Sequence, residues 1–251
     1  MSARRGTRPP SLSAVQTAII SCNRCSRLRR YCQDVGQVKK AAFRDDDYWA
    51  RPVPGFGDPQ ARVLILGLAP AAHGANRTGR VFTGDGIGAS GDFLMAALNR
   101  AGFANLTTSQ HVEDGLTLTD AYIAAAVRCA PPDNKPLPEE IETCLDHLVA
   151  EVACLPRLQI VVALGKIAWD AWLKLSARAG VEIPRPRPRF GHGATTHFGT
   201  PAPLHPCTLA PLHPSTLIGM YHPSRQNTNT GTVTPAMYDA VLRTLKDSLR
   251  S

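Results

Sequence analysis

Four short apolar runs, separated by segments with helical spacing, constrain the fold more than any other feature of the sequence. Each run is almost continuously hydrophobic and stops at turn-forming or polar residues. Runs of this length without polar alternation are typical of strands buried on both faces, as in a parallel sheet. The runs are residues 63–66, 122–127, 160–164 and 216–221.

The segments between and after these runs have apolar residues every three or four positions. In the clearest of them, a proline opens the segment at Pro138 and another follows it at Pro156, as is usual at helix boundaries. The four segments are residues 93–101, 138–152, 167–175 and 237–249. Strands that alternate with helices predict an α/β fold, a three-layer α/β/α domain around a central four-stranded parallel sheet.

The length of 251 residues allows one large domain or two small ones. We expect residues 1–20 to form a basic N-terminal extension and residues 21–251 to form a single domain. Residues 184–214 contain eight prolines and four histidines and have little periodicity. We therefore expect them to be an irregular insertion before the last strand.

The cysteine count and the lack of long apolar runs indicate the compartment. No run approaches the ~18 residues of a membrane span, and the start of the chain lacks the pattern of a signal peptide. Seven cysteines are an odd number in a chain too large to need disulfides, which favours a reducing environment. We expect a cytoplasmic monomer without a membrane partner.

The net charge of +8 lies entirely in the first 40 residues, which hold nine basic residues and one acidic residue. The rest of the chain is neutral. A dense folded basic patch suits a polyphosphate backbone, whereas a basic tail can simply aid solubility. We assign the first interpretation to the arginines around the first cysteine pair, namely Arg24, Arg27, Arg29 and Arg30.

Four cysteines form two pairs with different spacing. Cys22 and Cys25 form a CxxC unit, while Cys129 follows the second apolar run and Cys144 lies on the next predicted helix. Four thiolates can hold a tetrahedral zinc ion or an iron–sulfur cluster. The spacing alone leaves open the alternative that Cys129 and Cys144 are buried structural cysteines.

Ligands of an open parallel sheet bind at the carboxyl ends of its strands, so the residues that follow the apolar runs are the candidates for a site. After the first run, Phe82 can stack on a base and Asp85 can orient a water molecule. His222 follows the last run. Taken alone, it can equally be a histidine that is hydrogen-bonded for structural reasons.

Residues 86–91 match the pattern GxGxxG of dinucleotide-binding sites. That pattern belongs in the turn immediately after a strand, whereas here it lies well beyond the first run, and no acidic residue is suitably placed after the next one. A nucleotide site in this segment is therefore the weaker interpretation.

Taken together, these motifs resemble the family 5 (type B) uracil-DNA glycosylases of the iron–sulfur branch of that superfamily. The resemblance rests on the four cysteines and on three segments, and it covers the chain from Cys22 to about Val233. The segments are GLAPAAHGANRTGRVFTGD after the first run, VRCAPPDNKP after the second and YHPSRQNTNTG after the last.

The resemblance implies a [4Fe–4S] cluster bound by the four paired cysteines and a role in base excision repair. Residues 21–251 would then be one catalytic domain acting on DNA. The reaction hydrolyses the N-glycosidic bond of a deaminated base flipped out of the duplex and leaves an abasic site.

This sequence departs from the neighbouring iron–sulfur family 4 in its base-reading positions. Ala69 and Ala71 stand where that family has a polar residue, and Ala125 stands where it has an asparagine that pairs with uracil. A pocket without an amide reader discriminates less sharply, because specificity comes mainly from buried polar groups left unpaired. The resemblance thus implies that hypoxanthine and xanthine are accepted besides uracil.

We expect the following roles by this resemblance. His222 donates to O2 of the departing base, and Asp85 orients the water and stabilises the positively charged sugar. Phe82 stacks on the base, and Asn134 supplies an amide. Further contacts are expected from Ala69 and His73 to the base and from Ser224 and Arg225 to phosphates. No lysine of these motifs is expected to form a Schiff base, so the enzyme is expected to be monofunctional.

Two other classes of function remain open on the residues alone. One is an iron–sulfur redox or nucleotide-binding protein that uses the glycine-rich segment, and the other is a nonenzymatic DNA-binding module.

Overall fold

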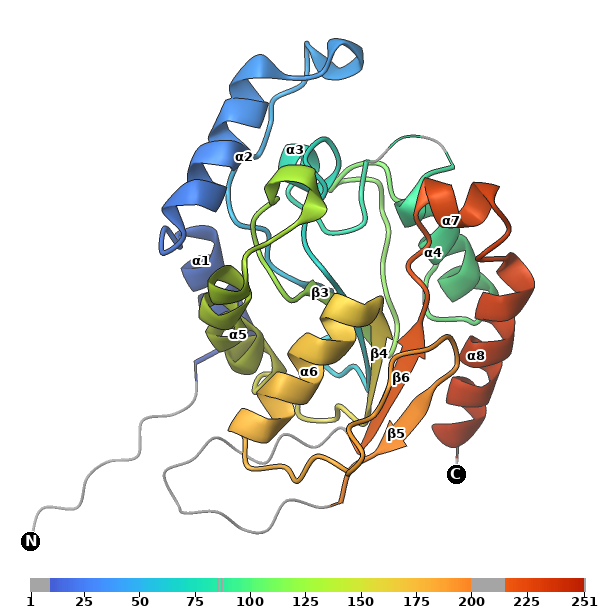
Figure 1. The fold of residues 1–251 in the computed structure, drawn as a ribbon. Helices are drawn as coiled ribbons and strands as arrows, with labels where there is room; N and C mark the ends of the chain where they lie inside the picture. Colours follow the sequence, from blue (N-terminus) through green and yellow to red (C-terminus); the bar gives the residue numbers. More distant parts are fainter. Residues whose placement is uncertain (1–9, 85, 87, 200–214, 251) are drawn as a thin grey trace, which may run out of the picture.

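The computed structural model describes residues 10–84, 86, 88–199 and 215–250. In this part of the chain, eight α-helices surround one six-stranded sheet with the order β1-β3-β2-β4-β6-β5 (Figure 1). The strands are β1 (Phe56–Gly57), β2 (Val63–Gly67), β3 (Ala121–Ala125), β4 (Ile160–Leu164), β5 (Thr195–His197) and β6 (Thr216–Met220).

The predicted α/β fold is confirmed, and the predicted number of strands is wrong. The four central strands β3, β2, β4 and β6 are parallel, as the apolar runs indicate. Two antiparallel edge strands, β1 and β5, complete a mixed sheet. Sequence reasoning missed β1 because it has only two residues, and β5 because it lies in the proline-rich segment and alternates between exposed and buried residues.

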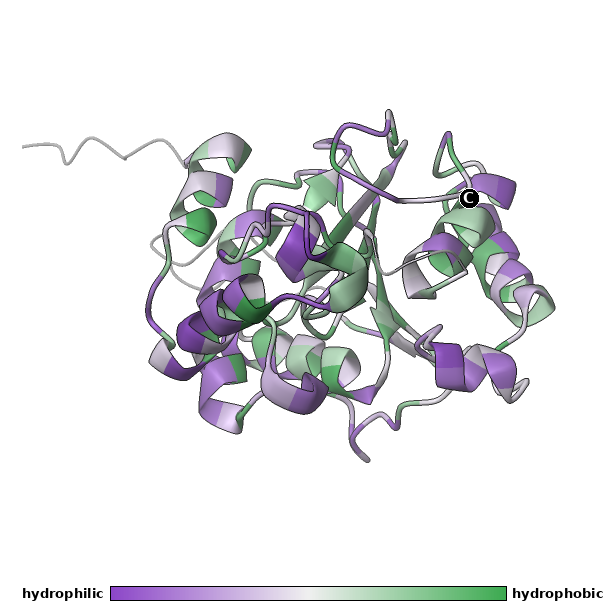
Figure 2. Cartoon of the chain, turned by 90° about the horizontal axis from the view of Figure 1, so that it is seen from above, coloured by the Kyte–Doolittle hydropathy of each residue, from purple (hydrophilic) through white to green (hydrophobic). Residues whose placement is uncertain are grey.

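Every residue of the strands β2, β3 and β4 is buried, because helices cover both faces of the sheet. Val63 and Ile65 face the layer of α4 (Ser90–Arg100) and α8 (Pro235–Ser248). Leu64 and Leu66 face the layer of α5 (Pro138–Val152) and α6 (Lys166–Arg178). Figure 2 shows this arrangement from above, with hydrophobic strands between helices of mixed polarity. The predicted three layers are thus present.

The helices begin and end close to their predicted bounds. Helix α5 starts at Pro138, and its first turn is capped by Glu140, whose carboxylate accepts the N–H of Leu137 at 2.7 Å. Just after α4, Gly102 has a φ of 73°. Such a left-handed residue after the last turn commonly ends a helix, and glycine adopts it without steric cost.

The folded region begins earlier than residue 21, so the predicted boundary of the N-terminal extension is corrected. Helix α1 (Leu12–Ile20) packs on α5, with Val15 and Ile19 buried. Gln16 donates to the hydroxyl of Tyr122 at 3.2 Å, which attaches α1 to β3. Residues 1–9 lie outside the described part of the chain. Helix α1 itself carries no charged residue, and the three arginines that precede it, Arg4, Arg5 and Arg8, lie outside the described residues.

Residues 184–199 of the predicted insertion run along the sheet edge and end in β5, whereas residues 200–214 lie outside the described residues. The shorter helices are α2 (Ser26–Val38), α3 (Ala75–Thr78) and α7 (Arg225–Asn229), with the 3-10 turns Ala41–Phe43 and Pro132–Asn134. None of the helices in the described ranges has the length and apolar character needed to cross a membrane.

Shortening one buried side chain of α1 tests whether this helix is part of the domain. Ile19 is fully buried, so Ile19→Ala is expected to lower the free energy of unfolding by ~2–5 kcal/mol. The exposed Thr17 of the same helix is the matched control, and Thr17→Ala is expected to change it by less than ~1 kcal/mol. Urea denaturation followed by circular dichroism measures both. Equal, small effects would mean that α1 is a detachable extension.

Candidate active site

A cavity of about 440 Å³ lies where the carboxyl ends of β2, β3 and β6 meet. Most of its walls are apolar, and a few polar groups converge on it, which is typical of small-molecule sites. It is lined by Leu68, Ala69, Ala71, Ala75, Val81, Phe82, Ala89, Ser90, Ala125, Asn134, His222, Ser224 and Arg225.

Parallel strand pairing brings these distant segments together. Beyond β2 and β3 the pairing continues for two residues, because the N–H groups of Ala126 and Val127 donate to the carbonyls of Gly67 and Leu68 at 2.9 Å. At the other wall, Ser224 caps the short helix α7, and its hydroxyl accepts the N–H of Asn227 at 3.3 Å. Helices α3 and α7 lie at the same end of the sheet (Figure 1).

Phe82 forms one wall of the cavity from a strained backbone. Its φ is 53°, a left-handed conformation that is costly for a residue with a large side chain. The ring lies against the end of β2, where a side chain at Gly67 would come within 3.0 Å of it. The ring also stacks on the imidazole of His222, with 5.8 Å between centroids and 28° between planes. An aromatic face is thus fixed beside an imidazole.

His222 presents a neutral imidazole to the cavity. It is half-buried, and burial lowers its pKa to about 4. Among the described residues, none is hydrogen-bonded to its ring, while its main-chain carbonyl accepts from the side chain of Asn227 at 2.8 Å. The strand end and this hydrogen bond fix the backbone and leave the ring available to a ligand. At neutral pH the ring can donate one hydrogen bond without carrying a charge.

Asn134 stands at the mouth of the cavity, in a turn that requires unusual backbone angles. Asp133 and Asn134 have φ values of 53° and 56°. Asparagine tolerates this left-handed conformation better than most residues. The turn follows Pro131 and Pro132, and it brings an exposed amide to the rim of an otherwise apolar pocket.

The structure brings together six of the predicted site residues and excludes one. The six that line the cavity are Ala69, Phe82, Asn134, His222, Ser224 and Arg225. His73 does not line it, which corrects that prediction. Its Nδ1 is 2.9 Å from the hydroxyl of Tyr48, which is not among the lining residues of the cavity either. Asp85 lies outside the described residues.

Sequence reasoning missed the apolar wall of the cavity. Leu68, Val81 and Ala89 lie in loop segments, where an apolar residue has no chemical signature. Only the position of these residues after the first strand pointed to the site.

The described part of the glycine-rich segment does not form a dinucleotide site. Gly91 lies in the first turn of α4, and the preceding strand, β2, ends much earlier in the sequence, at Gly67. The carboxylate of Asp92 accepts the N–H groups of Gly88 and Ser109, at 3.1 and 3.2 Å. The N–H of Gly88 therefore already donates to an acidic side chain of the protein and is not free for a phosphate.

The four paired cysteines converge beside the cavity, between α2, the end of β3 and α5. Cys129 and Cys144 are buried, while Cys22 and Cys25 are half-buried. Burial raises the pKa of the Cys25 thiol to about 11, and the thiols of the other three cysteines add to the effect. A fifth cysteine, Cys32, belongs to the same buried cluster of residues.

The predicted arginine patch is only partly free to face a ligand, which corrects that expectation. Arg24 pairs with Asp146 at 2.9 Å, and Arg27 pairs with the buried carboxylate of Glu140 at 2.7 Å. Arg29 donates to the carbonyl of Ala50 at 3.0 Å. Arg30 is exposed and, within the described ranges, has no such partner. Sequence reasoning missed the two ion pairs because Asp146 and Glu140 lie more than 100 residues away from their arginines. It missed the partner of Arg29 because that partner is a main-chain carbonyl.

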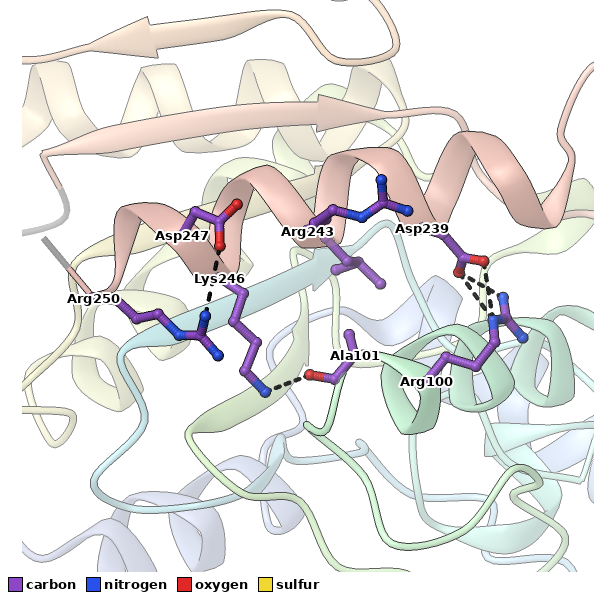
Figure 3. Close-up of a pocket in the computed structure, with 8 residues that line it drawn as sticks. Arg100, Ala101, Asp239, Arg243, Lys246, Asp247 and Arg250 are labelled. Atoms are coloured by element: carbon purple, nitrogen blue, oxygen red, sulfur yellow. Dashed lines mark hydrogen bonds and ion pairs between the residues drawn. The ribbon is translucent and has the colours of Figure 1, made fainter.

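A second cavity, of about 410 Å³, lies between α8 and the end of α4 (Figure 3). Its walls are charged, and most of its charges are already paired within the protein. Arg100 pairs with Asp239 at 2.8 Å, and the ammonium group of Lys246 donates to the carbonyl of Ala101 at 2.5 Å. No strand ends in it. The first cavity is therefore the candidate active site.

None of the six lysines of the chain lines the cavity at the strand ends. The arrangement can stack a flat ring on Phe82, donate a neutral hydrogen bond from His222 and offer an amide from Asn134.

Comparison with known proteins identifies a family and several relatives of this chain. The family model described as the uracil DNA glycosylase superfamily matches residues 54–246. A relative from Mycobacterium tuberculosis, named type-5 uracil-DNA glycosylase, is 46% identical over 237 residues, which cover 94% of this chain and 81% of the relative. A relative of the same name from Thermus thermophilus is 45% identical over 92% of this chain and 95% of its own length. A solved structure described as WT Pedobacter heparinus SMUG2 covers 76% of this chain and 77% of its own, with 16% identity and a TM-score of 0.46.

The protonation of His222 tests the electrostatics of the cavity. We expect its imidazole to remain neutral down to about pH 4, as seen in the ¹⁵N chemical shifts of its ring, assigned with a His222→Gln variant. Since this pKa lies below the value of ~6.5 in the unfolded chain, the unfolded state binds more protons between these pH values. His222 therefore lowers stability as the pH falls from ~6.5 to about 4. A titration midpoint near 6.5 would contradict the buried, neutral ring.

Proposed function

The chain belongs to the uracil-DNA glycosylase superfamily, and from this we propose that it is a DNA repair enzyme that removes uracil and other deaminated bases from DNA. The observation that carries the proposal is that Phe82 and His222 lie side by side in the lining of an apolar cavity at the strand ends. A base that has left the helical stack needs an aromatic or apolar face and a polar group at its edge. This cavity offers both.

The reaction breaks the bond between C1′ of the sugar and the ring nitrogen of the base, and water supplies the oxygen that replaces it. Negative charge develops on the base while positive charge develops on the sugar. We assign the base side to His222, whose ring N–H donates to the carbonyl oxygen O2. A neutral imidazole stabilises this oxygen more strongly in the transition state, where the oxygen gains charge, than in the substrate.

We assign the sugar side to Asp85. This residue follows Gly84 directly in the sequence, so it belongs to the same motif as Phe82. A carboxylate there would orient the attacking water and stabilise the positive charge of the sugar. The products are the free base and an abasic site.

We propose that the enzyme is monofunctional, that is, without lyase activity. A lyase step requires an amine that attacks C1′, and no lysine side chain lines the cavity. Excision therefore ends at the abasic site.

The lining of the cavity supports a broad range of bases. Its volume of about 440 Å³ leaves room for a purine, and Ala125 and Ala69 present methyl groups where polar readers would select one base. Asn134 at the rim is the remaining amide. A site with few buried polar groups rejects wrong bases weakly, because few groups are left unpaired. Hypoxanthine and xanthine are the other substrates that we propose.

The cysteine cluster fits a [4Fe–4S] centre. Burial raises the pKa of the Cys25 and Cys144 thiols, and neighbouring thiols of the same four cysteines add to this rise in both cases. Binding of thiolates to iron would remove this cost. In the described part of the chain, no group of three His, Cys, Asp or Glu residues is arranged to hold a single metal ion. A four-iron cube needs wider spacing, because each iron takes one thiolate. When bound, the cluster would link α2, the end of β3 and α5.

DNA is the proposed partner, and a monomer in the cytoplasm is the proposed state. Arg225 lines the cavity and Arg30 lies on the cysteine-bearing helix α2. Both are exposed cations that can bind phosphates. The hydroxyl of Ser224 caps α7 and its carbonyl accepts the N–H of Thr228 at 2.9 Å, so its main-chain N–H is the group that we assign to such a contact. A cluster bound by thiolates fits a reducing compartment.

Iron binding by cysteine variants tests the cluster. Protein purified without oxygen is expected to hold about four iron atoms per chain and to absorb near ~400 nm. Cys129→Ala is expected to lose both signals. Cys154→Ala is the matched control, because this thiol donates to the carbonyl of Pro10 and is apart from the other four. Loss of iron in the control, or a wild type without iron, would contradict the assignment.

Release of free uracil from a labelled oligonucleotide tests the activity. With EDTA present and no nucleotide added, the wild type is expected to leave an alkali-labile site and an uncut strand. Asp85→Asn and His222→Ala are each expected to slow the single-turnover rate at least ~10²-fold.

The controls for this assay are Asp247→Asn on α8 and His197→Ala on β5, both of which change exposed residues outside the cavity. Normal rates in Asp85→Asn or His222→Ala would remove that residue from the mechanism. If the wild type leaves no abasic site in uracil, hypoxanthine or xanthine DNA, the proposed function is wrong.

A further inference from the structure

The turn that carries Phe82 is held by an arginine that does not line the cavity. Arg77 is part of α3, and its side chain is only 13% exposed. Its guanidinium donates to the carbonyl of Gly84 at 2.5 Å and to the carbonyl of His73 at 2.9 Å. The same group pairs with Asp46 at 2.5 Å and lies over the ring of Phe43. One largely buried guanidinium group thus connects the start of α3, the turn at Gly84 and the segment of Phe43 and Asp46.

The turn needs such support because its backbone is strained. Phe82 has a φ of 53°, which costs ~1–3 kcal/mol and persists only where the surroundings fix it. Gly84 has a φ of 74°, and a side chain there would come within 2.7 Å of the Arg77 guanidinium. On the other side, the N–H of Gly84 donates to the carbonyl of Ser109 at 2.9 Å. The peptide groups of Gly84 are therefore held from both sides.

A second arginine, Arg80, fixes Thr83, the residue between Phe82 and Gly84. Arg80 donates to the hydroxyl of Thr83 at 2.9 Å and pairs with Asp114 at 2.6 Å, and both charged side chains are at most 10% exposed. Arg80 thus holds the side chain of the turn, whereas Arg77 holds its main chain where the turn leads to Asp85.

We propose that Arg77 is a positioning residue for base excision, which it supports by fixing the turn from Phe82 to Gly84. This inference rests on the proposed function. The stacking ring of Phe82 belongs to this turn, and Asp85, to which the mechanism assigns the sugar side, follows Gly84 directly in the sequence. A displacement of about 1 Å in a reacting group can cost ~10²-fold in rate. Lysine cannot replace Arg77, because a single ammonium group cannot reproduce the planar fork that binds several acceptors.

The test compares Arg77→Lys with Arg62→Lys. Arg62 is a matched control, because it forms the same kind of fork with Asp120 and donates to the carbonyl of Leu249 at 2.7 Å, next to the amino end of β2. In single-turnover assays with uracil DNA, Arg77→Lys is expected to lower the maximal rate ~10- to 100-fold and to change the DNA concentration for half-maximal rate less than ~3-fold. Arg62→Lys is expected to keep the wild-type rate.

Hydrogen exchange measures the turn itself, independently of activity. Mass spectrometry is expected to show at least ~10-fold faster exchange of the Gly84 amide in Arg77→Lys and wild-type exchange there in Arg62→Lys. Unchanged exchange of this amide, or equal loss of rate in both variants, would overturn the inference. If the wild type releases no uracil, the proposed function fails, while the exchange experiment still decides whether Arg77 holds the turn.

Discussion

The parallel pairing of β3, β2, β4 and β6 is the constraint on which the rest of the structure depends. It forces the carboxyl ends of all four strands to lie at one edge, which is where ligands of such sheets bind, and helices cover both faces of the sheet. The motifs that follow β2, β3 and β6 are far apart in the sequence, yet they meet there in one cavity. The apolar lining and the neutral His222 follow from the same burial. Burial thus creates both the stacking surface and the uncharged donor.

Helix α3 contacts both the cysteine-bearing helix α2 and the turn that forms a wall of the cavity. The side chain of Asn76 donates to the carbonyl of Cys32 on α2 at 3.2 Å, and the N–H of Ala50 donates to the carbonyl of Asn76 at 2.9 Å. From the next residue, Arg77, the guanidinium reaches the turn of Phe82. A centre that fixes α2 would therefore also support α3. The role that these contacts would give to the proposed cluster is structural.

The sequence predicted the parallel strands and most helices, because their apolar periodicity reflects burial directly. It did not predict β1 and β5, because these two edge strands are too short to have an apolar pattern of their own. They are strands only because they pair with β3 and β6. In the site, Phe82, Asn134 and His222 were predictable because each carries chemistry after a strand. His73 was misassigned, since its direction depends on the start of α3. The arginine pairs and the role of Arg77 depend on partners distant in the sequence, which no local pattern reveals.

The central claim is that a damaged base enters the cavity that Phe82 and His222 line, and a crystal structure tests it most directly. The Asp85→Asn variant would be crystallised with a uracil-containing duplex. The account predicts electron density for the extruded uracil within the cavity, its ring on Phe82 and its O2 at ~2.7–3.2 Å from a ring nitrogen of His222. A uracil bound elsewhere, or within the cavity with O2 turned away from His222, would contradict it.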